Sequence, residues 1–134
     1  MPQFSQRSLA KLATCDTRLQ LIFHHIILHF DCSILEGHRS KYRQNKLYRT
    51  GKSQLSYPHS KHNISPSLAV DVMPHPIDWQ DRERMTYFAG QVIATARHMG
   101  IAIRWGGDWD NNTQLKDNVF DDLAHYELIS SARW

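Results

Sequence analysis

The chain contains few cysteines and no long apolar segment, and these absences exclude several classes of protein. Cys15 and Cys32 are the only cysteines among 134 residues, and they form no Cys-x-x-Cys pair. A disulfide scaffold and a thiolate zinc site are therefore excluded, and we expect both thiols to be reduced and buried. The apolar run at residues 19–30 contains three histidines and is shorter than the roughly 20 residues that a membrane span needs.

The sequence also lacks a signal-peptide core, an arginine-rich arm, internal repeats and low-complexity tracts. We therefore expect a chain made in the cytoplasm, with no stable membrane insertion. Charge alone does not choose between nucleic acid, an anionic membrane surface and a cell-wall polymer, and the resemblance described below is the reason to expect no nucleic-acid partner. The net charge of +3 is a mild bias toward anionic partners, among which an acidic cell-wall polymer also fits. With 41% hydrophobic and 22% charged residues, the composition is that of a globular protein, and the length fits one domain over residues 1–134.

The hydrophobic pattern predicts helices mixed with short strands. Apolar residues at helical spacing predict one long amphipathic helix over residues 5–30, with Ser8 as a candidate N-cap. Turn and cap signals place the other elements at strand 32–37, helix 41–50, strand 68–74, helix 78–100, strand 101–105 and strand 125–129. Because the strands do not alternate regularly with helices, we expect an α+β fold.

Two of the expected helices have candidate caps at both ends. Ser40 precedes the helix at 41–50 and Gly51 follows it, whereas Asp78 and Gly100 bracket the helix at 78–100. Serine and aspartate side chains accept hydrogen bonds from the first backbone amides of a helix, and glycine readily takes the left-handed conformation that ends one.

Nine histidines in the chain make a metal site worth testing. His25 and His29 have the i, i+4 spacing that places two ligands on one helix face, but no acidic third ligand follows them. The simpler interpretation is that both are partly exposed helix residues.

The polar stretch at residues 51–67, which holds His59 and His62, is a long loop, and ordered long loops tend to carry function.

Metal-type ligands outside the helices fall into three stretches. His59 and His62 precede Asp71, which lies inside the apolar strand sequence "LAVDV", and Asp122 and His125 form a D-x-x-H pair. A catalytic zinc site needs three protein ligands and an open position for water, with a carboxylate nearby to take the proton of that water. A buried aspartate is costly unless a cation offsets its charge. Together these residues predict a catalytic metal site.

The motifs that carry these residues resemble a known family. "SKHNISPSLAVDV", "PIDW", "GIAIRWGGDWD" and "FDDLAHYEL", with "LEGHRS" and "RQNKLYRTGKS" before them, resemble zinc peptidases of the D-alanyl-D-alanine carboxypeptidase superfamily. The branch that matches best is that of the bacteriophage endolysins that are L-alanyl-D-glutamate endopeptidases. The family pattern S-x-H, A-x-D and D/E-x-x-H is filled in order by Ser60, His62, Ala69, Asp71, Asp122 and His125.

The resemblance implies a fold and a role for each matching residue. The fold would be a small antiparallel sheet that carries the zinc site, packed against two or three helices, as in the D-Ala-D-Ala carboxypeptidase and hedgehog-like proteins. His62, Asp71 and His125 would bind one zinc ion. Asp122 would act as the general base and then as the acid, and Arg39 would stabilise the oxyanion.

Four further residues are candidates for supporting roles. Ser60 would bond the substrate or a group behind the ligands, and Glu127 would point into the same site and help to orient a ligand. Trp105 and Trp109 would either line the substrate cleft or belong to the core.

One departure from the family pattern leaves the first ligand open. Eight residues separate His62 from Asp71, more than in much of the family, and the extra length lies in the loop "NISPS". His59 is therefore a competing ligand, although only His62 has the S-x-H context.

Plainer interpretations of the same residues remain open. Asp71 could pair with Arg39 or Arg104, and His125 could bond to backbone. Asp121 is expected to be solvated, and the acidic loop "DWDNN" lacks the ligand order of a calcium-binding EF-hand. The remaining histidines are expected at the surface or behind the ligands, namely His38, His75 and His98.

From the resemblance we expect a monomeric zinc peptidase whose partner is bacterial peptidoglycan. It would cleave the L-alanyl-D-glutamate bond of the stem peptide. Synthesis would occur in the host cytoplasm, with release to the wall by a holin-like route. The alternatives are a D-alanyl-D-alanine carboxypeptidase or dipeptidase, and a non-catalytic basic module that binds cell walls.

Overall fold

The structure is a computed structural model that describes residues 1–116 and 121–130; Phe120, the first residue of the motif "FDDLAHYEL", lies outside them. The described elements, in chain order, are helices α1 (Gln6–Leu12) and α2 (Thr17–Ile26), strand β1 (Cys32–Glu36), helix α3 (Lys41–Arg49), the 3-10 helix η1 (Lys61–Asn63), strand β2 (Ala69–Pro74), helix α4 (Arg82–His98), and strands β3 (Ile103–Gly106) and β4 (Asp122–Leu128). The strands form one antiparallel sheet in the order β1-β2-β4-β3. The predicted α+β class is confirmed.

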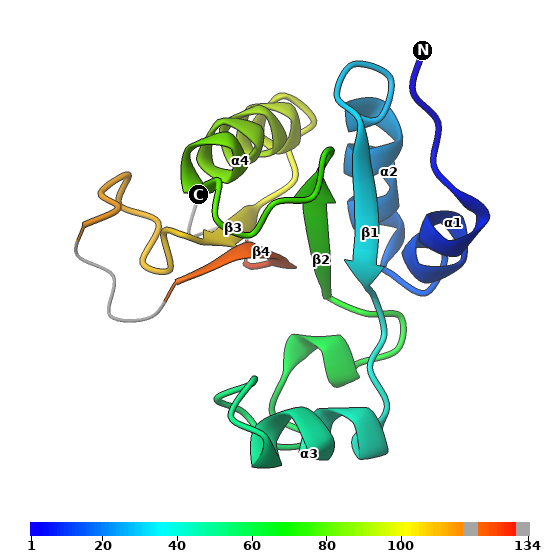
Figure 1. The fold of residues 1–134 in the computed structure, drawn as a ribbon, viewed down its shortest axis with the longest axis vertical. Coiled ribbons are helices and arrows are strands. Elements are labelled where there is room, and N and C mark those ends of the chain that lie inside the picture. Colours follow the sequence, from blue (N-terminus) through cyan, green and yellow to red (C-terminus); the bar gives the residue numbers. More distant parts are fainter. Residues whose placement is uncertain (117–120, 131–134) are drawn as a thin grey trace.

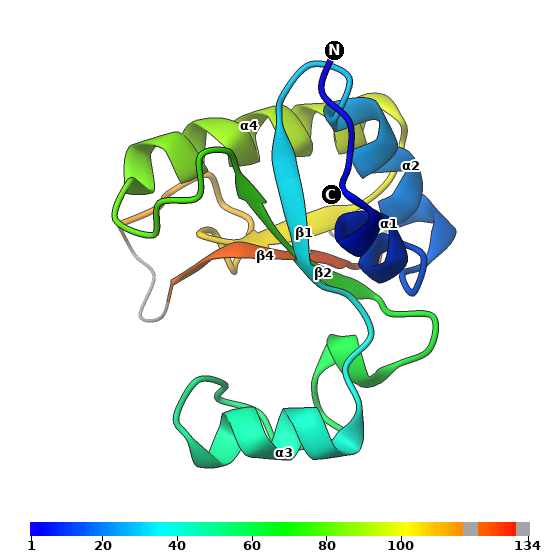
Figure 2. The ribbon, with the colours of Figure 1, turned by 45° about the vertical axis from the view of Figure 1, so that its right-hand side comes forward.

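Helices α2 and α4 cover one face of the sheet, and α1 packs against β1 (Figures 1 and 2). Tyr126 of β4 reaches both covering helices, with its ring centroid 5.6 Å from that of Phe23 and 6.5 Å from that of Phe88. All three side chains are fully buried, and burial of one such ring contributes roughly 1.5–3 kcal/mol. Because side chains alternate along a strand, Asp71 and His125, which precede the core residues Val72 and Tyr126, face the opposite side of the sheet.

The single helix predicted over residues 5–30 is wrong, because the chain breaks into α1 and α2 around Cys15. Asp16 caps α2 by accepting a hydrogen bond from the Arg18 amide. Cys15 also forms an isolated bridge with Ser67, which precedes β2. The apolar stripe continues through the break because both helices bury their apolar residues in the same core.

Two predicted N-caps are also wrong. Ser5 caps α1, whereas Ser8 is buried and its Oγ accepts a hydrogen bond from the amide of Ile34 in β1. At α4 the cap is Asp81, which accepts from the Arg84 amide, and Asp78 instead closes the preceding turn by accepting from the Gln80 amide. Asp78 and Asp81 both have the residue type expected at an N-cap, so the sequence pattern alone does not distinguish them.

The other predicted boundaries are close to those observed. Ser40 caps α3 by accepting from the Arg43 amide, and Gly51 and Gly100 follow α3 and α4 with φ of 75° and 72°. Within the described residues no helix combines the length and the apolar character that a bilayer crossing requires.

Residues 39–63, here called the α3 lobe, lie below the sheet in Figures 1 and 2, away from the helical layer. Gln44 is the one buried residue of α3. Its Oε1 accepts hydrogen bonds from Arg39 Nη1 at 2.8 Å and from Asn63 Nδ2 at 3.3 Å, and its Nε2 donates to Ser53 Oγ at 2.9 Å. The lobe is therefore organised around a buried amide rather than around apolar side chains.

Candidate functional site

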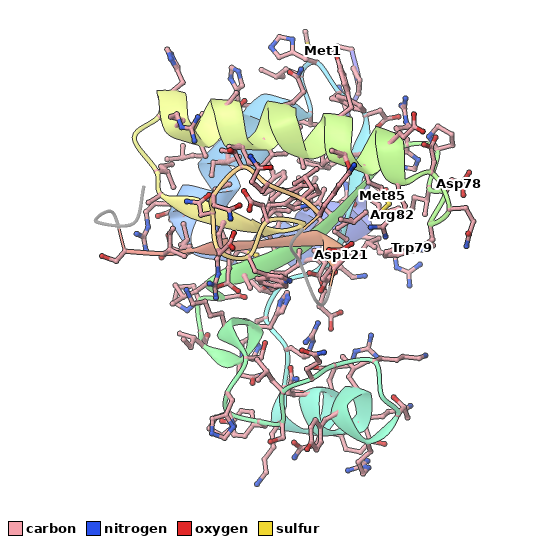
Figure 3. All side chains as sticks on the ribbon, turned by 90° about the vertical axis from the view of Figure 1, so that its left-hand side faces the viewer. Met1, Asp78, Trp79, Arg82, Met85 and Asp121 are labelled. Atoms are coloured by element: carbon pink, nitrogen blue, oxygen red, sulfur yellow. The ribbon has the colours of Figure 1, made fainter. Side chains whose placement is uncertain are left out.

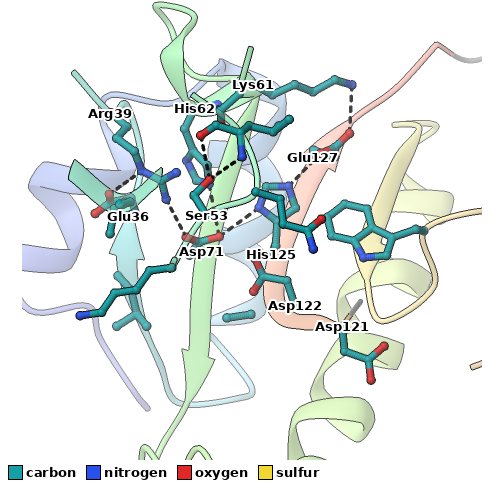
Figure 4. A pocket seen from close by; sticks show the side chains of 18 of the residues that line it. Glu36, Arg39, Ser53, Lys61, His62, Asp71, Asp121, Asp122, His125 and Glu127 are labelled. Carbon is teal, nitrogen blue, oxygen red and sulfur yellow. Dashed lines mark hydrogen bonds and ion pairs between the residues drawn. The ribbon is translucent and has the colours of Figure 1, made fainter. Parts of the chain in front are cut away.

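His62, Asp71 and His125 come together on the open side of the sheet (Figure 4). Asp71 and His125 are register partners on β2 and β4, and His62 comes from η1 in the α3 lobe. One ligand atom from each residue lies within 4.8 Å of the others. Asp71 Oδ1 is 3.3 Å from His62 Nε2 and 3.2 Å from His125 Nδ1. The three side chains could thus hold a single metal ion.

The outer nitrogen of each imidazole has a fixed partner. His62 Nδ1 lies 2.8 Å from the carbonyl oxygen of Gly37, and His125 Nε2 lies 2.8 Å from Glu127 Oε1. Because a carbonyl or carboxylate oxygen accepts, each of these nitrogens carries the proton in the neutral ring. The other nitrogen faces Asp71, and in the neutral ring its lone pair is free for a metal ion, which is the tautomer that ligation needs. Glu127 therefore orients His125.

The strongest sign of a ligand site is His62 Nε2, which is buried and has no hydrogen-bond partner among the described residues. A buried polar atom without a partner costs about 1–3 kcal/mol. The Nε2 atom faces the Asp71 carboxylate, so a cation between them would satisfy both groups. The donor set of two imidazoles and one carboxylate fits a divalent metal of the zinc type.

Asp71 is also held by Arg39, whose Nη2 lies 3.4 Å from its Oδ2. Burial acts to raise the pKa of Asp71, but the neighbouring imidazoles of His62 and His125 outweigh burial and hold that pKa well below its usual range. The pairing of Asp71 with Arg39 is therefore real and coexists with the cluster. The same carboxylate faces two imidazoles and a guanidinium.

A cleft of about 1250 Å³ opens beside these ligands and is lined by both Asp122 and Arg39. Asp122 begins β4 and stands outside the ligand cluster, and burial together with the negative charge of Asp71 raises its pKa. Arg39 is fixed by Glu36, whose Oε1 accepts from Nε at 2.8 Å, and by Gln44. A carboxyl group with a raised pKa and a clamped cation flank the cluster.

Of the supporting residues predicted from the sequence, some lie at the site and one lies in the core. Ser60 caps η1, and its Oγ accepts from the His62 amide, so it positions His62 through the backbone. Trp105 is buried on the core side of β3, where its indole donates to the Leu123 carbonyl, and it does not line the cleft. Trp109 lines the cleft, with its ring centroid 5.3 Å from that of His125.

The remaining candidates lie outside the cluster. His59 lines the cleft but is exposed. His25 and His29 are exposed and meet edge to face, with no third ligand among the described residues. His75 bonds to Ser33 Oγ, and Asp121 is exposed and paired with Arg82. His38 and His98 are exposed.

Sequence reasoning missed Glu36 and Gln44, which fix Arg39, and Trp79, which lines the cleft. Glu36 lies three residues and Gln44 five residues from Arg39 in the chain. The available signal for Gln44 was that α3 has no apolar stripe. A helix without such a stripe must turn a polar side chain inward if it packs against the rest of the chain.

Comparison with known proteins gives consistent results. A family model described as phage L-alanyl-D-glutamate peptidase matches residues 1–129. The L-alanyl-D-glutamate peptidase of Escherichia phage T5 is 26% identical over 136 residues, covering 95% of this chain and 98% of the relative. The crystal structure of an L-Ala D-Glu endopeptidase from Serratia marcescens superposes with a TM-score of 0.74 at 27% identity, covering 95% of this chain and 90% of the other. The chain belongs to the phage L-alanyl-D-glutamate peptidase family.

Proposed function

We propose that residues 1–134 form a single, monomeric zinc peptidase domain that hydrolyses the L-alanyl-D-glutamate bond of peptidoglycan stem peptides. The observation that carries the proposal is His62 Nε2, which is buried without a hydrogen bond among the described residues and faces Asp71 at the edge of a cleft. Family membership supplies the bond that is cleaved.

His62, Asp71 and His125 would hold the zinc ion. When bound, zinc makes a nucleophile available at neutral pH and polarises a carbonyl group. Glu127 keeps His125 in the ligating tautomer, and the Gly37 carbonyl does the same for His62.

Asp122 is the proposed general base and acid. Its raised pKa suits a carboxylate that takes a proton from the attacking water and delivers it to the leaving amine of D-glutamate. Arg39 would stabilise the carbonyl oxygen as it becomes negatively charged, because its guanidinium is already aimed at the cluster by Glu36 and Gln44.

The family is a phage family, so we also propose that the chain is made in the host cytoplasm and acts on the wall after a holin-like release step. A purified enzyme applied from outside would bypass that step.

The test combines metal analysis with digestion of purified peptidoglycan by wild type and Asp122→Asn. We expect one zinc per chain in both proteins and a loss of about 10²–10⁴-fold in cleavage rate for the variant alone. Asp121→Asn is the matched control, because its carboxylate is adjacent in the chain, exposed and paired with Arg82. Rapid cleavage by Asp122→Asn would show that Asp122 is not the base.

Mass spectrometry of the products identifies the bond. New alanine carboxyl ends and glutamate amino ends are expected. Release of terminal D-alanine would instead identify a carboxypeptidase, and an absence of new ends with no bound zinc would identify a non-catalytic wall-binding module.

A further inference from the structure

The cleft has chemically different ends, and the β1–β2 ribbon separates them. Glu36 at the end of β1 pairs with Asp71 and leads into the α3 lobe. At the other end of the ribbon Cys32 pairs with Pro74, after which the chain turns through residues 75–81 into α4. Figures 1 and 2 show this loop leaving β2 at the end away from α3. The cleft is lined by residues from both ends, so a ligand that fills it touches both.

The α3 end is cationic. Arg43 and Lys52 line the cleft there with Arg39; Glu36 pairs with both arginines, and Asp71 pairs with Arg39. Arg39 and Arg43 share Glu36 Oε1, at 2.8 and 3.2 Å, so one negative charge is divided between two guanidinium groups. The Arg43 side chain is 51% exposed, and no ion pair within the described residues holds the Lys52 ammonium group. This end retains positive charge for a ligand.

Within the described part of the chain, the loop at residues 75–81 contributes an indole and no cation to the cleft. Trp79 is 56% exposed, and none of the described residues forms a ring contact, cation–π contact or hydrogen bond with its side chain. Figure 3 places it beside Arg82 at the start of α4, well above α3. The other tryptophans near the site are occupied, since Trp105 is buried and Trp109 packs on His125 and Arg104. The exposed ring of Trp79 therefore has no role in core packing.

The proposed substrate has the same polarity as the cleft. On the L-alanine side of the scissile bond, the stem peptide joins the lactyl group of N-acetylmuramic acid, whose ring has an apolar face that can stack on an indole. On the D-glutamate side it carries free carboxylates. We propose, resting on the proposed function, that the stem peptide crosses the ligand cluster with its saccharide end at Trp79 and its carboxylate end at Arg43 and Lys52.

The dimensions agree with this direction. At a strand rise of roughly 3.3 Å per residue, Asp71 and Pro74 are about 10 Å apart along β2. L-alanine and the lactyl group span about 7 Å by the same measure, so the sugar begins near the end of the ribbon that carries the Trp79 loop. The reverse direction would place carboxylates against an uncharged indole and a sugar against two cations.

The test measures kcat and KM of Trp79→Ala and of the double variant Arg43→Gln/Lys52→Gln on three substrates. These are a disaccharide tetrapeptide, the N-acetylated tetrapeptide without sugar, and the disaccharide tetrapeptide with its carboxylates converted to amides. Tyr87→Ala removes an exposed aromatic ring outside the cleft, and Lys46→Gln/Arg49→Gln removes two exposed charges of α3 that do not line it. Both controls should behave as wild type on every substrate.

We expect Trp79→Ala to raise KM about 10-fold on the disaccharide tetrapeptide and less than about 2-fold on the sugar-free peptide. The double charge variant should raise KM about 10-fold on the carboxylate form and less than about 2-fold on the amide form. Equal effects on all substrates, or an exchange of the two patterns, would overturn the direction while leaving the peptidase activity intact. If wild type cleaves none of the substrates, the proposed function fails first, and the direction fails with it.

Discussion

The two sides of the cleft are stabilised by different interactions. On the sheet side, α2 and α4 bury rings such as Phe23, Phe88 and Tyr126 against one another. On the other side, the α3 lobe has one buried residue in its helix, Gln44, which is polar. Apolar packing acts over the whole layer, whereas the hydrogen bonds of one amide act only on the groups that they join.

The candidate metal ligands are divided between these two sides. Asp71 and His125 belong to the sheet, and His62 belongs to the lobe. A bound ion would therefore connect an apolar layer to a hydrogen-bonded lobe. The comparison makes four predictions, which separate the global stability of the layer from the local stability of the lobe.

The largest effect is expected in the apolar layer. Phe88→Ala should lower the free energy of unfolding by about 3–5 kcal/mol, because it leaves a cavity between α4 and Tyr126. Equilibrium unfolding in urea measures this change. Tyr87→Ala, at an exposed position next to Phe88, should change stability by less than about 1 kcal/mol. A loss below about 1 kcal/mol for Phe88→Ala would show that the layer does not depend on this contact.

Removal of the metal should act mainly on the lobe. If free zinc stands at 100 times its dissociation constant, binding contributes about 2.7 kcal/mol, and a chelator removes that contribution. Hydrogen exchange should then accelerate in residues 55–63, because His62 loses its tie to the sheet, while α2 and α4 keep their protection. Equal acceleration in α4 would contradict the separation of the two sides.

Gln44→Ala should destabilise the lobe by about 1–3 kcal/mol, because Arg39 Nη1 loses its hydrogen bond to Gln44 and Ser53 and Asn63 each lose one of theirs. Peptidase activity should fall with it, since Arg39 loses one of the groups that aim it. Lys46→Ala, at an exposed position of the same helix, should leave both properties unchanged. The measurements are hydrogen exchange over residues 53–63 and cleavage rate, and a variant that loses protection in α4 to the same degree would refute a local role.

The smallest effect concerns the two thiols, which report on the apolar layer. Burial raises the pKa of Cys15 to about 11 and that of Cys32 to about 12. A raised pKa keeps the thiol protonated and unreactive at pH 8, so iodoacetamide should modify neither residue in the folded protein and both in denaturant. The chelated protein should remain unmodified as well. Rapid labelling after chelation would mean that loss of the metal opens the core.

The ligand cluster could be predicted from the sequence because few residue types can bind a metal. His62, Asp71 and His125 were selected by side-chain chemistry and by motif, and the structure brings them within reach of one ion. The strands around them could be predicted for a similar reason, since apolar runs such as "LAVDV" allow few other arrangements.

Features that depend on distant contacts could not be predicted in the same way. The break between α1 and α2 is set partly by the backbone β-bridge between Cys15 and Ser67, two residues that are far apart in the chain. The inward orientation of Gln44 depends on the loop at residues 53–63 folding back over α3. The exposure of Trp79 depends on the path of the loop from β2 to the start of α4. Periodicity in one segment contains none of this information.

The position of β4 in the sheet has a consequence for protein synthesis. It is the last strand of the described chain, yet it lies between β2 and β3 and carries His125. A ribosome that has made the first 120 residues has therefore released two ligands of the cluster, but neither the third nor the strand that joins the two halves of the sheet. A nascent or interrupted chain carries no complete ligand cluster, so we expect peptidase activity only once synthesis has passed β4.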